Sequence, residues 1–470
     1  MKTKYRDTLS EMGPFLLFWS SQSFSSLGSA MTGYALVIWS YTQSGSALRT
    51  AMLMVSTYAP YVLLSIFAGA LSDRWNKKRT LLVCDFIAAC TTVAALILLR
   101  GGMLRIWHLY LINGIGGVSN TLQQPASEVA TTRILPKKYY QRVGGLRYLS
   151  SSCNSILTPI LATAVMGLVG LEGVIFFDLF TFLTAFFVLA LLIRIPGDEI
   201  NGSTVSDDAW RNDIGQKDAD KSDAGQEKIK RQDSVLALTK EGIVYLRQEK
   251  GIFGLMMYLA AINLVASVYD AAFPAMMLSR EGGSEQVLGM VNAVIGVSTL
   301  FGSLIASLVK KPKSRVRMVE YCLLFTMSTE NFMLAFGRTP LIWCIGGFCG
   351  WILIPLMSGN LDAIYRLRVP EEMQGRFYAV RNSFQFFTIP VGYLLGGILV
   401  DYVFEPIMAR QSVDSVLTHL FGMGKGSGAA FLFGVLGIAG VMVCLYFQGN
   451  KQIRELKAEE MQDIDNTRYR

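Results

Sequence analysis

Charged residues are scarce in this chain of 470 residues, and histidine is almost absent. Asp, Glu, Lys and Arg make up 17% of the sequence and hydrophobic residues 52%. Soluble domains carry about 25% charged residues. The deficit argues against a soluble enzyme and excludes disorder, because most of the surface cannot face water. With only His108 and His419, the sequence also argues against a histidine metal site or proton relay.

The cysteines and glycines form no catalytic or cofactor motif. All seven cysteines lie in apolar segments, without the spacing of a zinc site or a disulfide framework, so we interpret them as small core residues. The glycine-rich run Gly422–Gly428 lacks the spacing of a phosphate-binding loop, and we interpret it as a flexible lead into a helix. No nucleophile with a base and no nucleotide-binding fold is visible. The sequence therefore predicts neither an enzyme nor an ATP-driven pump, and no cofactor or metal.

Apolar stretches recur along the chain, each close to the roughly 20 residues that a membrane-spanning helix needs. We place twelve of them, at 14–39, 50–72, 80–99, 105–126, 147–170, 173–193, 252–279, 286–309, 318–337, 340–362, 378–400 and 427–448. The polar stretch 198–233 separates six from six and is typical of a solvated linker. After it, 234–248 has helical apolar spacing and is expected to lie along the membrane surface.

These patterns predict an all-α integral membrane protein with twelve transmembrane helices in two six-helix halves. The expected parts are an N-terminal half (1–195), a cytoplasmic linker (196–250), a C-terminal half (251–450) and a cytoplasmic tail (451–470). With the N-terminus inside, 36 of the 43 Lys and Arg residues fall in inner segments and 7 in outer ones. Such an excess is typical of cytoplasmic loops. The net charge of +8 therefore indicates orientation, with both termini cytoplasmic, rather than a nucleic-acid partner.

The loop after the second span reads Gly69-Ala-Leu-Ser-Asp73-Arg74-Trp-Asn-Lys77-Lys78-Arg79. Gly69 permits close helix approach, and Asp73 offers a carboxylate to a neighbouring helix N-terminus. Together with the six-plus-six plan, this loop resembles that of the major facilitator superfamily, whose halves contain inverted three-helix repeats. The alternative is a plain positive-inside loop. The resemblance implies a conformational latch between this loop and 375–381, with the participants Gly69, Asp73, Arg74, Arg79 and Arg376.

Further motifs narrow the resemblance. Gln124-Pro-Ala-Ser-Glu-Val-Ala and Glu241-Gly-Ile-Val-Tyr-Leu-Arg look like the macrolide-efflux branch of the drug:proton antiporters. Val369-Pro-Glu-Glu-Met-Gln-Gly-Arg and the run 392–406 are similar to exporters associated with nonribosomal peptide pathways. The arginine that many antiporters carry in helix 4 is missing, since no basic residue lies between Arg105 and Arg133. Proton antiport therefore rests on the resemblance.

Four carboxyl groups lie in the expected spans, where acids are costly and usually functional. In the superfamily helix 7 lines the central cavity and helices 3, 6 and 9 lie outside, so Asp270 in helix 7 is the first candidate for proton coupling. The alternative is that Asp270 lies near the outer mouth of the cavity, in contact with water. Glu330 and Asp178 are further candidates, for which a structural hydrogen bond is the favoured interpretation. Asp85 is interpreted as a partner of the basic loop.

Polar and aromatic residues on the expected lining helices are candidates for binding substrate. They are Gln22, Asn113, Asn263, Tyr269, Trp351 and Asn360. Packing between helices is the alternative role for each small polar residue. Trp19, Trp39, Trp107 and Trp343 are expected in aromatic belts at the membrane faces. Gly392 and Gly396 have the spacing of close helix packing.

Residues and resemblance together predict a secondary transporter in the cytoplasmic membrane of a bacterium. It is expected to export amphiphilic small molecules, such as drugs, macrolides or peptide natural products, in exchange for protons. The resemblance implies a monomer that alternates access to a midplane site, with the lipid bilayer, protons and substrate as its partners. Two alternatives stay open. One is an importer or facilitator of a small metabolite, and the other a membrane sensor that kept the fold without transport.

Overall fold

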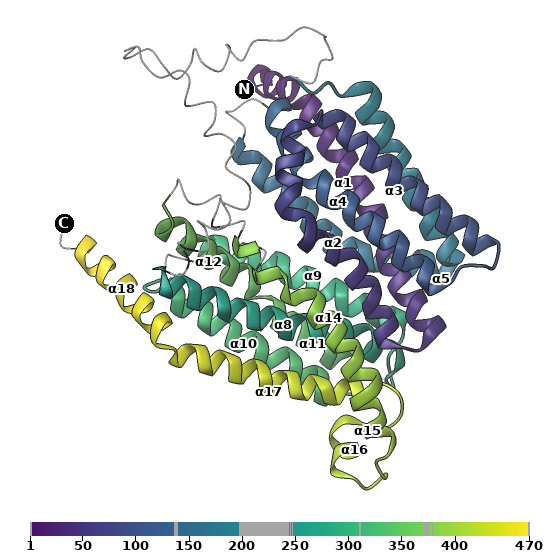
Figure 1. Ribbon diagram of the computed structural model, residues 1–470, viewed down its shortest axis with the longest axis vertical. Helices are drawn as coiled ribbons and strands as arrows, with labels where there is room; N and C mark the ends of the chain where they lie inside the picture. The colour runs from purple at the N-terminus through teal and green to yellow at the C-terminus, as the bar shows by residue number, and fades with distance from the viewer. Residues whose placement is uncertain are drawn as a thin grey trace.

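A computed structural model describes residues 2–135, 140–196, 244, 246, 248–309, 312–370, 377, 380–382 and 384–468. Within these ranges it leaves the side chains of 2–11, 66–74, 140–145, 147, 148 and 461–468 undescribed. All regular secondary structure in the described part is helical (Figure 1).

The first half of the chain forms five long helices and a short π-helical turn. They are α1 (Lys2–Ser44), α2 (Ala47–Arg74), α3 (Lys77–Arg100), α4 (Ile106–Ile134), α5 (Tyr140–Phe187) and η2 (Val188–Leu192). With 48 residues, α5 is about 70 Å long along its path, roughly twice the thickness of a bilayer core. It kinks at Gly170, whose φ of 75° is open to glycine at little cost. The kink separates the two spans expected at 147–170 and 173–193.

The second half is built from shorter pieces. They are α8 (Lys250–Ser279), α9 (Glu285–Leu308), α10 (Arg315–Phe336), α11 (Pro340–Trp351), α12 (Ile354–Arg368), α14 (Thr388–Ile398), η4 (Leu399–Phe404), α15 (Glu405–Ala409), α16 (Val416–Phe421), α17 (Ser427–Gly449) and α18 (Lys451–Arg468). The span expected at 340–362 is thus broken between Trp351 and Ile354 into α11 and α12.

Among the described residues, eight helical stretches are long and apolar enough to cross a membrane. One of them, Leu149–Leu192, contains two of the expected spans. The expected spans within α1, α4 and α10 do not reach the same apolarity, although these helices have 43, 29 and 22 residues. The count of twelve and the orientation therefore stay predictions.

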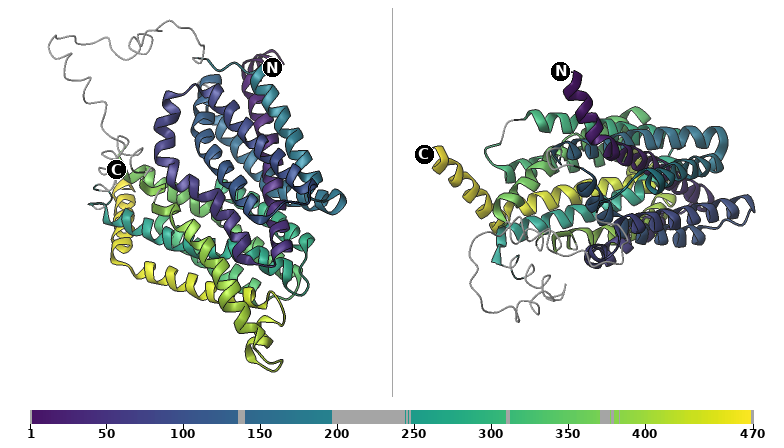
Figure 2. Two further views of the ribbon diagram at one scale, coloured as in Figure 1. Left: turned by 45° about the vertical axis from the view of Figure 1, so that its right-hand side comes forward. Right: turned by 90° about the horizontal axis from the view of Figure 1, so that it is seen from above.

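The helices form two bundles. We call α1 to η2 the N-terminal half and α8 to α17 the C-terminal half. Both termini lie at one end of the molecule, the linker side, and the α1–α2 turn lies with α15 and α16 at the other end, the far side (Figures 1 and 2). The two halves meet toward the far side, and their linker-side ends lie apart in both figures.

The most extensive contacts between the halves join α2 to α14 and α5 to α9. The rings of Tyr58 and Tyr393 meet edge to face, with centroids 6.4 Å apart. Gly289 lies against α5, where an added Cβ would be 2.6 Å from Thr163 Oγ1. These contacts determine how closely the two halves pack against each other.

Glycines on α14 allow it to pack on two neighbours. A Cβ at Gly392 would lie 2.5 Å from Ser267 Cβ, and one at Gly396 would lie 2.7 Å from the Val268 carbonyl oxygen. This confirms the close packing predicted from their spacing, here against α8. Gly397 faces α2 instead, where a Cβ would lie 2.5 Å from Leu48 Cα.

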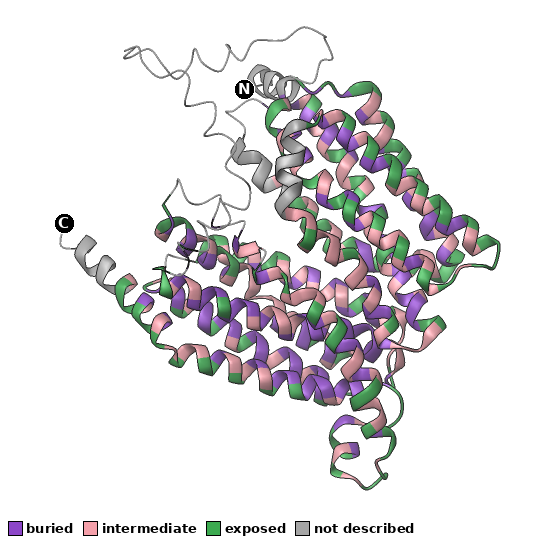
Figure 3. Cartoon of the chain, in the orientation of Figure 1, coloured by how far each residue is buried: buried purple, intermediate pink, exposed green. Residues whose placement is uncertain are grey.

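The C-terminal half holds the larger apolar core (Figure 3). In the span of α8, 61% of the residues are buried, against 28% in the span of α3. Trp343 lies in this core fully buried and donates its indole N–H to the Gly337 carbonyl at 2.9 Å. Its placement in an aromatic belt is therefore wrong, because its N–H finds a partner at a helix end inside the protein.

The C-terminal helix α18 braces the linker side of this half. Glu460 accepts hydrogen bonds from the backbone N–H groups of Arg315 and Val316 at 2.9 and 3.2 Å, and so caps α10. Lys457 pairs at 2.5 Å with Glu320, a carboxylate only 2% exposed. The helix is therefore an integral part of the C-terminal half.

Candidate functional site

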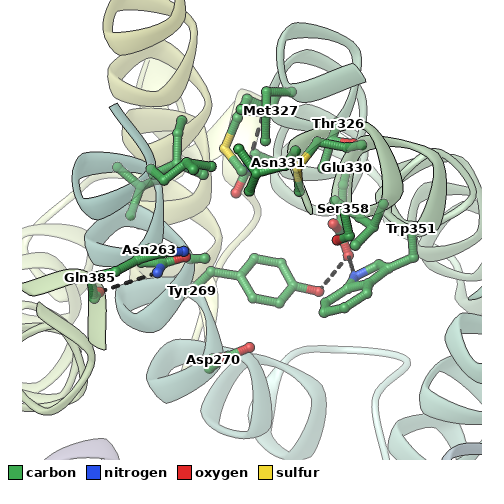
Figure 4. A pocket seen from close by; sticks show the side chains of 18 of the residues that line it. Asn263, Tyr269, Asp270, Thr326, Met327, Glu330, Asn331, Trp351, Ser358 and Gln385 are labelled. Atoms are coloured by element: carbon green, nitrogen blue, oxygen red, sulfur yellow. Dashed lines mark hydrogen bonds between the residues drawn. The ribbon is translucent and has the colours of Figure 1, made fainter. Parts of the chain in front are cut away.

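A cavity of about 390 Å³ lies inside the C-terminal half, between α8, α10, α12 and the segment before α14 (Figure 4). Its walls are mainly apolar, with Leu259, Ile262, Val265, Leu323, Met327, Ile354, Met357 and Leu361. Five of the predicted site residues line it together, namely Asn263, Tyr269, Asp270, Glu330 and Trp351.

Glu330 is held by two donors. The Tyr269 hydroxyl donates to Glu330 Oε1 at 2.6 Å, and Trp351 Nε1 donates to the same oxygen at 3.0 Å. Gly350 makes room for the carboxylate, because a Cβ there would lie 2.4 Å from Glu330 Oε2. Glu330 thus has the hydrogen bond to a neighbouring helix that the sequence analysis expected, and the same carboxylate reaches the cavity, so its role stays a prediction.

Asp270 lines the same cavity but differs from Glu330 in its hydrogen bonding. Among the described residues that line the cavity, none is seen to hydrogen-bond to its carboxyl, and Figure 4 draws no dashed line to it. The basic residue of the lining, Arg381, is paired with Asp362 at 3.6 Å. A carboxyl without a fixed partner in apolar surroundings favours binding either a proton or a cation.

Asp178 and Asp85 of the N-terminal half accept hydrogen bonds from neutral donors on neighbouring helices. Ser29 Oγ of α1 donates to Asp178 Oδ1 at 3.0 Å, as the structural interpretation of Asp178 predicts. Gln123 Nε2 of α4 donates to Asp85 Oδ1 at 2.7 Å. The structure thus places Asp85 against α4, whereas the sequence suggested the basic loop as its partner.

A second cavity, of about 610 Å³, lies in the N-terminal half between α1, α4 and α5. Predicted residue Gln22 lines it. The other lining residues are Phe15, Phe18, Trp19, Ser23, Ser26, Gln124, Ser127, Thr131, Ser150, Ser151, Asn154 and Ser155. This set of described residues contains hydroxyl, amide and aromatic groups and no ionisable one. Asn154 Nδ2 donates to Ser26 Oγ at 3.0 Å, so part of the polarity also ties α5 to α1.

The remaining predicted cavity residues lie elsewhere. Asn360 is buried and donates to the Leu356 carbonyl of its own helix at 2.8 Å, outside the lining of the first cavity. Asn113 is half-buried on α4 and belongs to neither lining. The sequence analysis missed Gln385, which lines the first cavity and whose backbone carbonyl accepts a hydrogen bond from Asn263 Nδ2 at 3.2 Å. It lies in the span expected at 378–400, which was not among the expected lining helices.

The predicted latch lies largely outside the described residues. Gly69, Asp73 and Arg74 occupy the last turns of α2, with side chains outside the description, and Arg376 lies wholly outside it. Arg79 is exposed in the first turn of α3, and its backbone N–H donates to Asn76 Oδ1 at 2.9 Å. The latch itself stays a prediction.

Long apolar helices with cavities inside their bundles are an architecture found in membrane transporters. The chain belongs to the Major Facilitator Superfamily, whose family model matches residues 18–393. Members of this family are transporters, and the chain is accordingly a transporter rather than an enzyme.

Among characterised relatives, the chain is 20% identical to macrolide efflux protein A of Streptococcus pyogenes over 394 residues, covering 83% of this chain and 90% of that protein. It is 21% identical to the multidrug efflux pump Tap of Mycolicibacterium fortuitum over 407 residues, covering 84% and 91%. The crystal structure of a bacterial homologue of the iron transporter ferroportin matches with a TM-score of 0.61 and 13% identity, covering 92% of this chain and 98% of that one. The similarity to this crystal structure concerns the fold alone.

Proposed function

We propose that this protein exports amphiphilic small molecules across the cytoplasmic membrane of a bacterium in exchange for protons. The observation that carries the proposal is the cavity of the C-terminal half, where unpaired Asp270 and hydrogen-bonded Glu330 share apolar and aromatic walls. The efflux proteins among the relatives support the direction of transport. The protein acts as a monomer and needs no cofactor.

The chemistry of the cavity favours substrates that carry a basic nitrogen on an apolar body. The Asp270 carboxylate attracts the cation, and the faces of Trp351 and Tyr269 can accept it by cation–π contact. Apolar walls bind the remainder of the molecule. A proton and the substrate cation compete for the same carboxylate, and this competition couples the release of one to the binding of the other.

Alternating access follows from a rocking of the two halves about this site. In the proposal the linker side is the cytoplasmic side, where the ends of the halves lie apart. The substrate then enters from the cytoplasm or inner leaflet. The reverse state closes the linker side, with Asp73 at the segment 375–381 as its latch.

The experiment is drug efflux in a bacterial host that lacks its own pumps. Cells that express the protein should accumulate less of an amphiphilic cation than cells with an empty vector, and an uncoupler should remove the difference. Counterflow in vesicles without a proton gradient tests the alternative of a facilitator. Efflux that persists unchanged with the uncoupler, or uptake in place of efflux, would overturn the proposal.

A further inference from the structure

Asp401 connects the two halves at the far side. It lies in η4, and its carboxylate reaches the start of α2 in the other half. Oδ1 accepts from the Ala47 N–H at 2.9 Å, and Oδ2 accepts from the Leu48 N–H at 3.0 Å and from the Ser46 hydroxyl at 2.5 Å.

These bonds complete the N-terminus of α2. The first N–H groups of a helix have no partner within the helix itself. Asp401 satisfies those of Ala47 and Leu48, and Ser46 Oγ accepts from the Arg49 N–H at 3.1 Å. A negative charge also suits the positive end of the helix dipole. The C-terminal half therefore supplies acceptors for two N–H groups of α2, and Ser46 of the N-terminal half caps a third.

Neighbouring contacts explain why Asp401 can reach α2. Gly397, four residues earlier, allows α14 to approach Leu48, as described above. Farther along the far side, Lys425 lies over the ring of Tyr41 in the other half, with Nζ 5.6 Å from the ring centroid. Contacts of Asp401, Gly397 and Lys425 thus join the two halves at the far side.

A second carboxylate nearby provides a comparison. Glu405, four residues after Asp401, accepts from the N–H groups of Gly426 and Ala429 at 2.9 and 3.3 Å. It caps α17 within its own half and fixes the glycine-rich run, whose Gly426 has a φ of 90°. The run predicted as a flexible lead is therefore tied to a neighbouring helix end. A rocking motion of the halves leaves the Glu405 contacts intact.

We propose that the cap of α2 by Asp401 is the latch of the far side. It holds the molecule in the far-side-closed state and must break, exposing both partners to water, each time the halves rock to open the far side. Asp401 is thus a positioning residue for transport. The inference goes beyond the proposed function, because it concerns the conformational equilibrium and holds for any substrate and any coupling ion.

The test measures a distance across the far side in the purified full chain. Spin labels are placed at Met103 and Val416, one in each half and 60% and 73% exposed, after replacement of the seven native cysteines. Loss of a helix cap changes an equilibrium by about tenfold. Asp401→Ala and Asp401→Asn should shift the distribution toward longer distances by about that factor, without substrate. Glu405→Gln should leave it unchanged.

Two results would overturn the latch. One is an unchanged distance distribution in both Asp401 variants, and the other is an equal shift in Glu405→Gln, which would mean general loosening. A cross-link covers the case that the Asp401 variants fail to fold. Ser46→Cys with Asp401→Cys, joined by a short thiosulfonate reagent, should stop transport and regain it with a reductant. Transport that continues in the cross-linked protein also refutes the latch, while leaving the proposed export untouched.

Discussion

The two halves share a fold but differ in the chemistry of their interiors. The cavity of the C-terminal half contains Asp270 and Glu330, whereas the cavity of the N-terminal half is lined by neutral polar and aromatic groups. The N-terminal half has carboxylates as well, but Asp85 and Asp178 are bonded to neighbouring helices by neutral donors. An intramembrane acid is thus not by itself a sign of a binding site. What distinguishes the C-terminal half is that Asp270 and Glu330 face a cavity.

The two halves also differ in packing, and the C-terminal half is the more buried one. Buried residues concentrate in α8, α10 and α17, while the helices of the N-terminal half expose more of their surface (Figure 3). A dense surrounding keeps ionisable groups away from water and makes their protonation sensitive to a bound cation. In the proposed export, this difference divides the roles of the halves. The C-terminal half couples proton binding to substrate binding, and the N-terminal half binds the neutral part of the substrate.

Removing the charge of Asp270 should reduce transport more than any other substitution considered. Asp270→Asn removes this carboxylate from the cavity of the C-terminal half, so proton-driven efflux should fall by about a hundredfold, at the lower end of the effect of losing a proton-transfer group. Proteoliposomes with an imposed pH gradient provide the measurement. Asp178→Asn is the matched control, expected to retain activity within about threefold, the cost of one hydrogen bond. An unchanged proton dependence in Asp270→Asn would remove this residue from coupling.

Glu330 tests whether the second carboxyl acts by charge or by shape. Glu330→Gln keeps an oxygen that accepts from Tyr269 and Trp351 but removes the charge. Transport of cationic substrates should fall by about tenfold, the effect of losing one charge interaction of about 1.4 kcal/mol, and transport of neutral ones should change little. Competition assays with matched charged and neutral compounds check this. Equal losses for both classes would indicate a packing role, and the thermal stability of the variant serves as its control.

The two sides of the membrane provide a third contrast. Asp73→Asn should weaken the linker-side latch and reduce transport by about fivefold, within the range of a helix-cap loss, while membrane insertion stays intact. The distance between labels at Met103 and Val416 should shorten on average, opposite to the effect of Asp401→Asn. Normal efflux in Asp73→Asn, with no change in that distance, would count against the linker-side latch.

Neutral substitutions in the cavity of the N-terminal half should have the smallest effects. Gln22→Ala removes one amide, so the apparent affinity should weaken by about threefold with the proton dependence unaltered. Dose–response curves for several substrates measure both quantities. A loss of proton coupling in this variant would contradict the division of labour between the halves.

The sequence predicted the class of fold well, because hydrophobic length and basic loops are local signals. It was less informative where function makes a helix polar. The expected spans in α1, α4 and α10 contain Gln22, Asn113 and Glu330, and these helices are the ones whose composition does not reach that of a typical span. The residues that carry the candidate function thus weaken the signal that identifies their helices.

The site was partly predictable. Asp270, Tyr269, Asn263 and Trp351 line one cavity, as expected for residues on lining helices. The position of Glu330 depends on how far α10 is rotated and on the space left by Gly350, and neither is readable from local sequence. Asp401 was visible in the run 392–406, but its partner Ser46 lies 355 positions away, so no local pattern could indicate the pairing.

The cap that Glu460 provides has a consequence for biosynthesis. Glu460 follows its partner Ser314 by 146 positions, so the ribosome inserts α10 long before α18 emerges. Until then the N–H groups of Arg315 and Val316 lack the Glu460 carboxylate, and Glu320 lacks Lys457. The C-terminal half therefore reaches its final stability only when α18 has been made and has docked. Chains arrested before that point should be the ones that membrane proteases remove.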